Sequence, residues 1–490
     1  MKLSTLVEGL CPSPFRGYDP EIKGISLNSA QVREGYLFVA IKGRKRDGHQ
    51  FIPEAIKRGA VAIVCEEETF SIPNIPVIRV AQARQAIAKL ASRFYANPSA
   101  QIHLTGITGT NGKTTVSYLI KHLLEGLGKR AGLLGTINYE IGRRIIPAIY
   151  TTPEAVEINA YLREMVNEKI DYAILEVSSH SIAQKRIAEL DFNSGIFTNF
   201  SPDHLDYHRD LEEYFQTKRS FLQSLPEKGQ AILNIDDKRY EEIVEGMKAK
   251  VFSYGVKRQG DIFLKRHSVD LSLKGMKFLV CVKDEEYLVE SSLIGEYNIY
   301  NILCAICFCL SEGFSPKAIV PLLKEFSGVP GRLERIECGQ DFLVFVDYAH
   351  TEDALRNVLR TMRSILPAGA RLISIFGCGG DRDRQKRPVM GKVGSELSDL
   401  LILTSDNPRT EDPEEILKEV AKGIERRDNY QIILDRREAI RKGIEVARTG
   451  DVVVIAGKGH EKYQVFKDTI IPFDDREVVR EEIKALLRRR

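Results

Sequence analysis

Short apolar runs alternate with stretches of helical periodicity along the middle of the chain. The runs occupy residues 102–108, 172–179, 194–199 and 231–237, and each is separated from the next by enough residues for a helix. This alternation is typical of a parallel β-sheet whose strands are joined by crossover helices. Residues 250–294 depart from it with closely spaced short runs, which predict an antiparallel β excursion.

The two ends of the chain show the same two kinds of element. The last third has five apolar runs, at 343–350, 371–380, 400–409, 430–435 and 451–461. Polar residues gather at the carboxyl ends of these runs, which is where open α/β sheets bind ligands. We therefore predict a doubly wound sheet there.

Turn-forming residues interrupt the pattern at two places. The first 95 residues hold shorter runs and one helical stretch over 81–95, which predict a small α/β domain. Residues 95–99 and 327–331 carry proline, glycine and asparagine where periodicity lapses. These breaks predict three domains over 1–97, 98–328 and 329–490.

Composition narrows the possible functions. The 490 residues carry a net charge of +3, too little to indicate bulk nucleic-acid binding. No apolar run approaches the roughly 18 residues of a membrane span, and the N-terminus lacks a signal-peptide pattern. The eight cysteines show few paired spacings, and Cys304, Cys307 and Cys309 fit a buried helix face better than a metal site. We expect a cytoplasmic protein that does not bind nucleic acid and has no membrane span.

The strongest chemical signal is TGITGTNGKTT, residues 105–115. Gly109 and Gly112 would let backbone N–H groups turn toward phosphate oxygens at a helix N-terminus. Lys113 would reach the terminal phosphates, and the Thr114 hydroxyl would hold Mg²⁺. The first glycine of the usual phosphate-loop motif stands one place early, at Gly106. Because a strand precedes the loop and a helix follows it, we predict an ATP site.

Downstream polar residues supply candidate metal ligands. Glu176 ends an apolar run, and a carboxylate suits Mg²⁺. The segment NFSPDHLDYHRD follows another run and includes His204 and His208. A zinc site would also use such residues, but the phosphate loop favours magnesium. Lys218 lies ten residues after His208, and spacing alone does not distinguish it from a surface lysine.

Seven motifs then occur in a fixed order: GTNGKTT, LEVSSH, DHLDYH followed by a lysine, GEYNIYN, GVPGRLE, VDYAHT and GKGHE. Together they resemble the Mur ligases, the ATP-dependent amide ligases of peptidoglycan assembly. The resemblance spans almost the whole chain. It implies a UDP-binding N-terminal α/β domain, a central P-loop ATPase-type domain and a C-terminal Rossmann-like domain.

The resemblance also implies roles for individual residues. Those at the ATP site would be Gly109, Thr110, Asn111, Gly112, Lys113, Thr114, Thr115, Asn298, Asn301, Arg332 and Asp347. The Mg²⁺ ligands would be Thr114, Glu176, His204 and Lys218, the last as the carbamate it forms with CO₂. Lys113, Lys218 and His208 would be catalytic; His208 or a carboxylate near the second metal would take the proton of the amine.

Two further sets of residues match substrate contacts. Those expected to hold the UDP-muramoyl dipeptide are Leu27, Ser29, Arg44, Lys45, Arg46, Thr151, Thr152, Ser178, Gln184 and Arg186. Those expected to hold the incoming amino acid are Arg382, Asp406, Asn407, Pro408, Arg409, Gly457 and Glu461. The chain departs from the family at Asn28-Ser29-Ala30, often Asp-Ser-Arg, and at Glu352, often proline.

The sequence Asp406-Asn407-Pro408-Arg409 resembles the family version that selects meso-diaminopimelate. This substrate has a second carboxylate that lysine lacks, and the planar guanidinium of Arg409 suits a carboxylate. Glu461 could pair with the distal ammonium.

The resemblance therefore implies addition of meso-diaminopimelate to the D-Glu γ-carboxylate of UDP-N-acetylmuramoyl-L-alanyl-D-glutamate. The step would proceed through an acyl phosphate and serve cell-wall synthesis, cell shape and division. We expect a monomer. Three alternatives stay open: the same reaction with L-lysine, a folylpolyglutamate synthase-like ligase, and a P-loop ATPase without ligase activity.

Overall fold

The computed structural model describes residues 1–10, 17–43, 46–66, 74–205, 207–426 and 428–489. Contacts divide the chain into two compact units. One comprises residues 1–263 with 300–319, and the other comprises 264–299 with 320–490. The mixed α/β class is confirmed in both, whereas the boundaries at 97 and 328 stay predictions.

The N-terminal region forms a four-stranded parallel sheet in the order β1-β2-β3-β4. Its strands are β1 (Gly24–Ser26), β2 (Tyr36–Val39), β3 (Ala60–Cys65) and β4 (Val77–Arg79). Its helices are α1 (Leu3–Leu6), α2 (Ile52–Lys57) and α3 (Ala83–Phe94), with 3-10 turns at Ser29–Gln31 and Gly48–Phe51. Separate apolar clusters cover the two faces of the sheet. Short apolar runs at 24–29, 36–41 and 61–67 predicted the first three strands, whereas β4 was not predicted.

The central sheet follows the order β13-β12-β11-β10-β5-β9-β6-β7-β8. Its strands are β5 (His103–Thr108), β6 (Ala131–Leu134), β7 (Asn138–Ile141), β8 (Arg144–Pro147), β9 (Tyr172–Glu176), β10 (Ser194–Phe197), β11 (Gln230–Asn234), β12 (Lys250–Gly255) and β13 (Ile262–Leu264). Strand β5 lies between β9 and β10 and runs parallel to both. Within this series of described strands, β7 pairs antiparallel with both β6 and β8. The carboxyl ends of β5, β9 and β10 therefore meet at one edge.

Helices cover both faces of this sheet. They are α4 (Lys113–Gly126), α5 (Ala155–Asn167), α6 (Ser179–Ala183), α7 (Leu211–Gln223), α8 (Tyr240–Val244) and α9 (Tyr297–Ser311), with a 3-10 turn at Pro98–Gln101 and a short α10 (Pro316–Ile319). Helices α5, α7 and α8 share one apolar cluster with the sheet. Gly106 lies within β5, where an added Cβ would stand 2.5 Å from Phe221 and 2.8 Å from Phe192. This glycine therefore serves aromatic packing under the strand rather than the phosphate loop.

The predicted β excursion is confirmed as β14 (Asp270–Ser272), β15 (Gly275–Val282) and β16 (Glu285–Ser291), which pair antiparallel. A 3-10 segment, Val320–Glu325, follows later in the chain. Lys277 and Lys324 both pair with Glu290 of β16 and lower the pKa of that carboxyl to about 2.

The C-terminal sheet has the order β17-β18-β22-β19-β20-β21. Its strands are β17 (Glu334–Ile336), β18 (Leu343–Asp347), β19 (Leu372–Phe376), β20 (Leu400–Leu403), β21 (Tyr430–Ile432) and β22 (Val452–Ala456), and a separate hairpin comprises β23 (Tyr463–Phe466) and β24 (Thr469–Pro472). All pairs in the six-stranded sheet are parallel except β17 with β18. This confirms the doubly wound sheet; β17 and the hairpin were not predicted.

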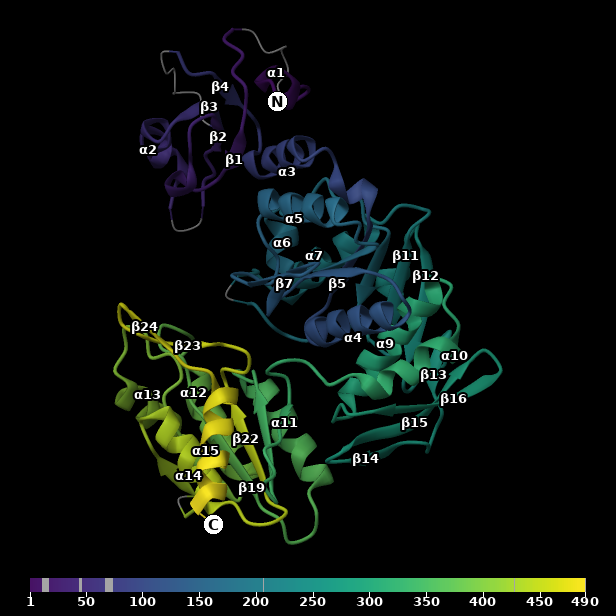
Figure 1. Ribbon diagram of the computed structural model, residues 1–490, viewed down its shortest axis with the longest axis vertical. Helices are drawn as coiled ribbons and strands as arrows, with labels where there is room; N and C mark the ends of the chain where they lie inside the picture. The colour runs from purple at the N-terminus through teal and green to yellow at the C-terminus, as the bar shows by residue number, and fades with distance from the viewer. Residues whose placement is uncertain (11–16, 44–45, 67–73, 206, 427, 490) are drawn as a thin grey trace. The chain divides into compact units, whose positions relative to one another are not determined.

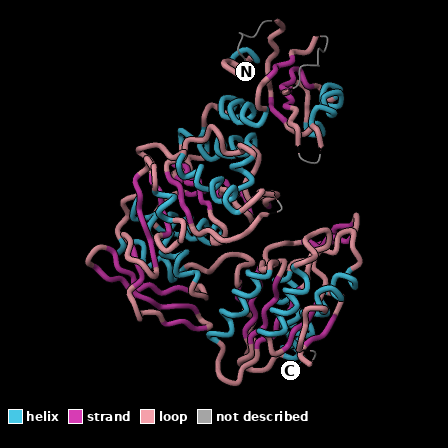
Figure 2. Tube along the Cα trace, turned by 180° about the vertical axis from the view of Figure 1, so that it is seen from behind, coloured by secondary structure: helices cyan, strands magenta, loops and turns pink. Residues whose placement is uncertain are grey.

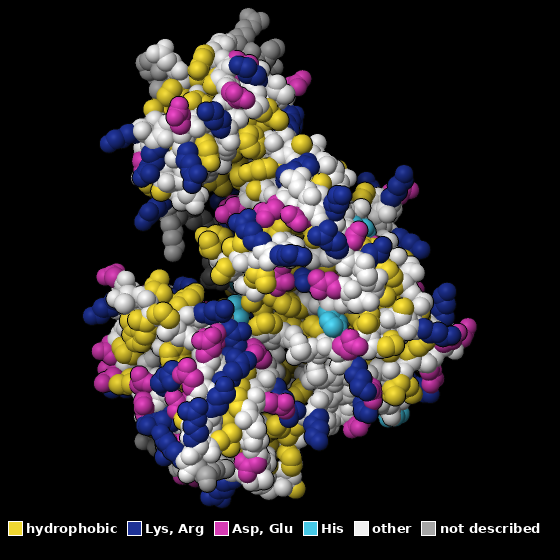
Figure 3. All heavy atoms as spheres, in the orientation of Figure 1, with side chains coloured by type: hydrophobic (Ala, Val, Ile, Leu, Met, Phe, Trp, Pro, Cys, Tyr) yellow, Lys and Arg dark blue, Asp and Glu magenta, His cyan; other side chains and the backbone are white. Residues whose placement is uncertain are grey.

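Five helices pack on the two faces of the C-terminal sheet (Figures 1 and 2). Helices α11 (Glu352–Ile365), α12 (Lys386–Leu397) and α13 (Pro413–Ala421) share one apolar cluster, and α14 (Arg436–Val446) and α15 (Asp475–Arg489) share the other. Basic and acidic side chains are interspersed over the visible face of α15 (Figure 3). Arg437 of α14 pairs with Glu481 and Glu482 of α15, so neighbouring carboxylates balance part of the basic charge.

Within the described residues, no helix combines the length and the apolar character needed to cross a membrane. The seven described cysteines are all free thiols. Cys304, Cys307 and Cys309 are buried on α9, and burial raises the pKa of Cys304 to about 12. Their predicted place in the core is confirmed.

A fully buried ion pair joins α14 to α15. Arg436 and Asp475 are both inaccessible, and Nε and Nη2 of the guanidinium lie 2.7 Å from the two carboxylate oxygens. We expect Arg436→Met to lower the free energy of unfolding by about 3–5 kcal/mol, because it leaves a buried carboxylate unpaired. Urea unfolding would measure the loss, with Arg437→Met on the exposed face of α14 as the matched control. A loss no larger than that of the control would contradict the prediction.

Candidate active site

The phosphate loop joins the end of β5 to the start of α4, as predicted. Gly109 and Gly112 have φ angles of +142° and +87°, in the left-handed range that favours glycine. A Cβ on Gly109 would stand 1.9 Å from the Thr198 hydroxyl oxygen, and one on Gly112 would stand 2.5 Å from Asn301 Oδ1. Both the backbone angle and the packing therefore require glycine at these positions. Asn301, predicted for the ATP site, lies against the loop.

The segment after β10 holds the loop in place. The backbone N–H of Thr110 donates to the Asn199 carbonyl over 2.8 Å, and the N–H of Asn111 donates to Asn199 Oδ1 over 3.0 Å. Thr198 Oγ1 donates to the carbonyl of Asn111 over 2.6 Å. Sequence reasoning missed Thr198 and Asn199; their place directly after a strand beside β5 was the available signal. Since these bonds occupy two loop N–H groups, an anion would be bound chiefly by the first turn of α4.

Glu176 is completely buried at the carboxyl end of β9. Its carboxylate accepts hydrogen bonds from Thr114 Oγ1 at 2.9 Å, Thr136 N at 3.0 Å, Thr136 Oγ1 at 2.9 Å and Ser117 Oγ at 3.4 Å. Two of the four predicted Mg²⁺ ligands, Thr114 and Glu176, are thus in direct contact. Hydroxyl groups can rotate to present lone pairs, so this group of oxygens fits a hard cation.

Two lysines converge on the loop from different helices. Lys113 Nζ donates to the carbonyls of Gly109 and Thr110, each over 2.9 Å. Lys218 of α7 donates to the same Gly109 carbonyl over 2.9 Å and lies over the ring of Tyr214 at 4.6 Å. Burial, together with the charge of Lys113, holds the pKa of Lys218 well below its usual range. Lys218 is therefore not a surface lysine but a buried amine at the phosphate loop.

Aromatic side chains surround the predicted histidines. The ring of His180 lies 4.9 Å from that of His204 and 6.0 Å from that of His208, measured between centroids. His208 is 1% exposed; neither ring nitrogen has a hydrogen-bond partner among the described residues, and burial lowers its pKa. Its Nδ1 lies 3.8 Å from Glu213 Oε1. Burial thus favours the neutral form of the His208 imidazole. The described residues include no group of three or more His, Cys, Asp or Glu side chains that could hold a metal ion.

The predicted dipeptide contacts of the central domain form one cluster. Thr152 Oγ1 donates to the Glu176 carbonyl over 2.7 Å and lies 3.2 Å from Ser178 Oγ. Arg186 donates to the carbonyl of Thr152 and to Gln184 Oε1, and it pairs with Glu154 at 3.0 Å. Thr151 Oγ1 lies 3.2 Å from Thr136 Oγ1 and can donate to it. Through Thr152, this cluster is in direct contact with Glu176.

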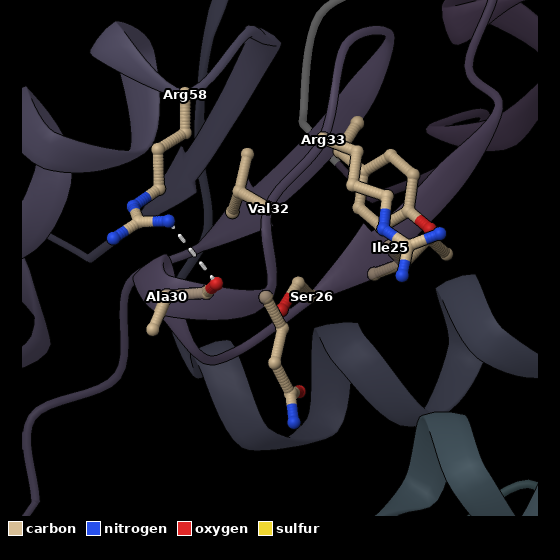
Figure 4. A pocket seen from close by; sticks show the side chains of 8 residues that line it. Ile25, Ser26, Ala30, Val32, Arg33 and Arg58 are labelled. Carbon is tan, nitrogen blue, oxygen red and sulfur yellow. Dashed lines mark hydrogen bonds between the residues drawn. The ribbon is translucent and has the colours of Figure 1, made fainter.

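The predicted UDP contacts belong to the N-terminal sheet. Ser29 donates to Glu54 Oε2 over 2.7 Å, Leu27 is half-buried and Arg46 is exposed; Arg44 and Lys45 lie outside the described residues. Residues before and after the segment 27–29 line a cavity of about 630 Å³ (Figure 4). Its lining is Ile25, Ser26, Ala30, Gln31, Val32, Arg33, Tyr36 and Arg58. The cavity flanks the predicted UDP contacts but includes none of them.

The predicted amino-acid site is assembled from three strand ends of the C-terminal sheet. Arg409 has a left-handed φ of +54°, and its guanidinium donates to the Gly380 carbonyl over 2.7 Å. The hairpin holds its backbone, because its N–H donates to Val465 and its carbonyl accepts from Lys467. Arg382, from the same loop as Gly380, is exposed and bonds to the Asp381 carbonyl over 3.3 Å.

The remaining residues of this site lie behind Arg409. Asn407 Nδ2 donates to Glu461 Oε2 over 3.0 Å. A Cβ on Gly457 would stand 2.7 Å from Asp406 Oδ2, so only glycine permits this approach. A Cβ on Gly380 would stand still closer, 1.8 Å from the carbonyl oxygen of Pro408. The loop after β19, the segment 406–409 and the segment 457–461 therefore lie in contact at one place in the C-terminal domain.

The predicted nucleotide contacts of the C-terminal domain lie near a ring cluster. Asp347 is buried and accepts from the N–H groups of Leu333 and Ala349; burial raises its pKa. The Arg332 guanidinium lies over the Tyr348 ring at 4.9 Å, and that ring is 4.9 Å from the ring of His460. Asn298 donates to the Ile294 carbonyl, one helical turn earlier.

Comparisons with known proteins show which family this architecture belongs to. Residues 21–95 match the Mur ligase family catalytic domain, 107–309 the Mur ligase middle domain and 331–459 the Mur ligase glutamate ligase domain. The chain is 44% identical to a UDP-N-acetylmuramoyl-L-alanyl-D-glutamate--2,6-diaminopimelate ligase of Syntrophomonas wolfei, over 99% of both chains. The chain belongs to the Mur ligase family. The three-domain architecture implied by its motifs is thereby confirmed for this Mur ligase.

Two other proteins show the same likeness. This Mur ligase is 44% identical to a protein of the same name from Clostridium botulinum, over 99% of this chain and all of the other. A solved structure of a UDP-N-acetylmuramoyl-L-alanyl-D-glutamate--2,6-diaminopimelate ligase aligns with a TM-score of 0.72 and 33% identity, covering 99% of this chain and 100% of that one.

The half-buried His460 makes stability depend on pH. Burial, with Arg332 nearby, lowers its pKa to about 4 in the folded state, against about 6.5 when unfolded. Only the unfolded chain gains this proton between those values, so stability is intact above pH 6.5 and falls as the pH drops. We expect His460→Gln to remove about 2 kcal/mol of the loss between pH 7.5 and pH 5. Urea unfolding at both pH values would test this, and parallel losses in the two proteins would contradict it.

Proposed function

We propose that this Mur ligase joins meso-diaminopimelate to the D-Glu γ-carboxylate of UDP-N-acetylmuramoyl-L-alanyl-D-glutamate, with conversion of ATP to ADP and phosphate. One observation carries the choice of reaction: Lys113, Thr114, Glu176 and Lys218 converge on a single phosphate loop. The substrates are those in the names of the relatives at 44% identity. We assign the reaction to the cytoplasm, which suits a chain whose described cysteines are all free.

Thr114 and Glu176 would hold Mg²⁺, and His204 would contribute from the segment after β10. The contact between the Thr114 hydroxyl and the Glu176 carboxylate supports this assignment, since both are oxygen ligands. When bound, Mg²⁺ neutralises phosphate charge. Ser117 and Thr136 hydrogen-bond Glu176 and keep its orientation fixed.

Lys218 is proposed to carry a carbamate. Its lowered pKa favours the neutral amine, whose lone pair can attack CO₂. The N–C bond forms as one C=O π bond of CO₂ opens and its electrons move to oxygen, the nitrogen then releases a proton, and the neutral amine has become an anionic oxygen ligand. Because Lys218 is only 1% exposed, it is not one of the solvated surface lysines of the protein.

In the first chemical step, the D-Glu γ-carboxylate attacks the γ-phosphorus of ATP, and the bond to the leaving ADP oxygen breaks. Lys113 is placed to leave the carbonyls of Gly109 and Thr110 and follow the phosphate charge. In the second step, the amine attacks the acyl carbon and phosphate departs. The amine must lose a proton; the neutral imidazole of His208 is the group we propose to accept it.

The direct experiment supplies the protein with ATP, Mg²⁺, bicarbonate and the UDP-muramoyl dipeptide, and weighs the product by mass spectrometry. Parallel reactions contain meso-diaminopimelate or L-lysine, and a further reaction replaces the dipeptide with a folate. We expect the meso-diaminopimelate product alone to accumulate. ATP hydrolysis without any joined product would instead support a bare ATPase.

Lys113→Ala should lower ligation by at least about 100-fold, because the developing phosphate charge loses its cation. Lys129→Ala, an exposed lysine just after the same helix, is the matched control and should stay near wild type. Product formation in single-turnover reactions would measure both. Near-normal ligation by the Lys113 variant would refute the assignment of the phosphate loop.

Arg409→Ala should lower kcat/KM for meso-diaminopimelate by about 100-fold and leave that for L-lysine nearly unchanged. The reason is that only the former carries the distal carboxylate that a guanidinium binds. Arg441→Ala, on the exposed side of α14, serves as the control. An unchanged ratio of the two kcat/KM values would show that Arg409 does not select the substrate.

A further inference from the structure

A buried lysine stands behind the predicted amino-acid site, and no role described so far uses it. Lys458 is wholly inaccessible at the carboxyl end of β22. Its Nζ donates to Glu461 Oε2 over 2.9 Å and to Asn407 Oδ1 over 3.1 Å. Both partners are residues predicted to contact the incoming amino acid. A buried ammonium thus reaches the site from behind.

Asn407 and Glu461 are fixed as a pair by this ammonium. Asn407 Nδ2 donates to the same Oε2 of Glu461 that Lys458 contacts, and its Oδ1 also accepts from the N–H of Val465. The amide and the carboxylate therefore each have one settled orientation. No hydrogen bond between described residues reaches Glu461 Oε1, and the side chain is 19% exposed. That oxygen remains available to a substrate ammonium.

The pair has a consequence for charge. The charges of Lys458 and Glu461 cancel, so an incoming ammonium meets a neutral ion pair rather than a bare carboxylate. The positive charge on Lys458 Nζ also repels that ammonium, because both bind the same carboxylate. An ammonium that arrives with its own carboxylate is compensated, since Arg409 offers that carboxylate a cation. An ammonium without a neighbouring carboxylate has no such compensation, and its binding gains little free energy. The arrangement favours a zwitterionic end over a purely cationic one.

We infer that Lys458 is a specificity-determining residue that makes the amino-acid site reject a distal ammonium lacking a neighbouring carboxylate. This inference rests on the proposed function and extends it from Arg409, which attracts the carboxylate, to a second group that penalises its absence. Lys458 does not touch the reacting atoms; it acts through Glu461 and Asn407.

Three amino acids separate this role from a merely structural one. meso-Diaminopimelate carries both distal groups, L-lysine carries only the ammonium, and 2-aminopimelate carries only the carboxylate. In Lys458→Met the pocket keeps the shape of the side chain but loses its charge. We expect kcat/KM for L-lysine to rise at least tenfold relative to that for meso-diaminopimelate, with no relative gain for 2-aminopimelate. KM for ATP should not change.

The controls are two lysine variants. Lys462→Met makes the same change at an exposed lysine of the same loop and should behave as wild type. Lys458→Arg keeps the charge and should restore the wild-type order of the three substrates. A proportional loss with all three substrates in Lys458→Met would overturn the inference, because a distorted site would affect them alike.

A second variant tests the same inference if Lys458→Met does not fold. In Lys458→Gln the side-chain amide can still donate to Glu461 or Asn407, but the charge is lost. kcat/KM for L-lysine should again rise at least tenfold relative to that for meso-diaminopimelate, and an unchanged ratio would overturn the inference. Wild-type ligation of meso-diaminopimelate is measured first. Its absence would refute the proposed function and this inference together, whereas an active wild type with an unaltered substrate order in the variants refutes the inference alone.

Discussion

A carboxylate buried at the end of a central strand governs the arrangement of the ATP site. Removing Glu176 from water is costly, and the four hydrogen bonds it accepts offset that cost. Those bonds come from α4 and from the residues after β6, so satisfying one side chain ties two neighbouring elements to β9. The phosphate loop, the helix that follows it and the candidate metal ligands therefore keep a common geometry.

The loop itself is held by a second constraint, close approach. Gly109 and Gly112 let Thr198 and Asn301 come within distances that a Cβ would forbid. The C-terminal domain repeats the device where Gly457 meets Asp406 and Gly380 meets Pro408. In both domains glycine lets loops from separate strands touch, and polar side chains of those loops then converge at the carboxyl edge of the sheet.

The C-terminal domain relies on buried cations to join its loops. Arg387, with no exposure, binds Glu411 and Glu419 and reaches the carbonyl of Gly379. Arg436 reaches the carbonyls of Ser405 and Ala456, which directly precede two of the motifs. Lys458 completes the set. Each cation bonds to several acceptors, so each fixes strand ends that are distant in sequence.

Much of this protein could be predicted from local patterns. Apolar periodicity located β5, β9, β18 and β22, and a strand–glycine–helix pattern identified the phosphate loop, because these features depend on residues close in sequence. The motifs also named Lys218 and Asn301 as site residues, and the structure places both against the loop. Short elements without periodicity, such as β4 and the hairpin that holds Arg409, could not be found in this way.

The amino-acid order alone thus settled where the longer strands and helices lie and which residue types are candidates for the chemistry. Packing settled the rest: that Lys218 is buried beside Lys113, that Thr198 and Asn199 occupy loop N–H groups, and that Lys458 stands behind Glu461. Burial and proximity between residues about a hundred positions apart arise from the way sheets bring distant loops together. They change pKa values and hydrogen-bond partners, which no local pattern encodes.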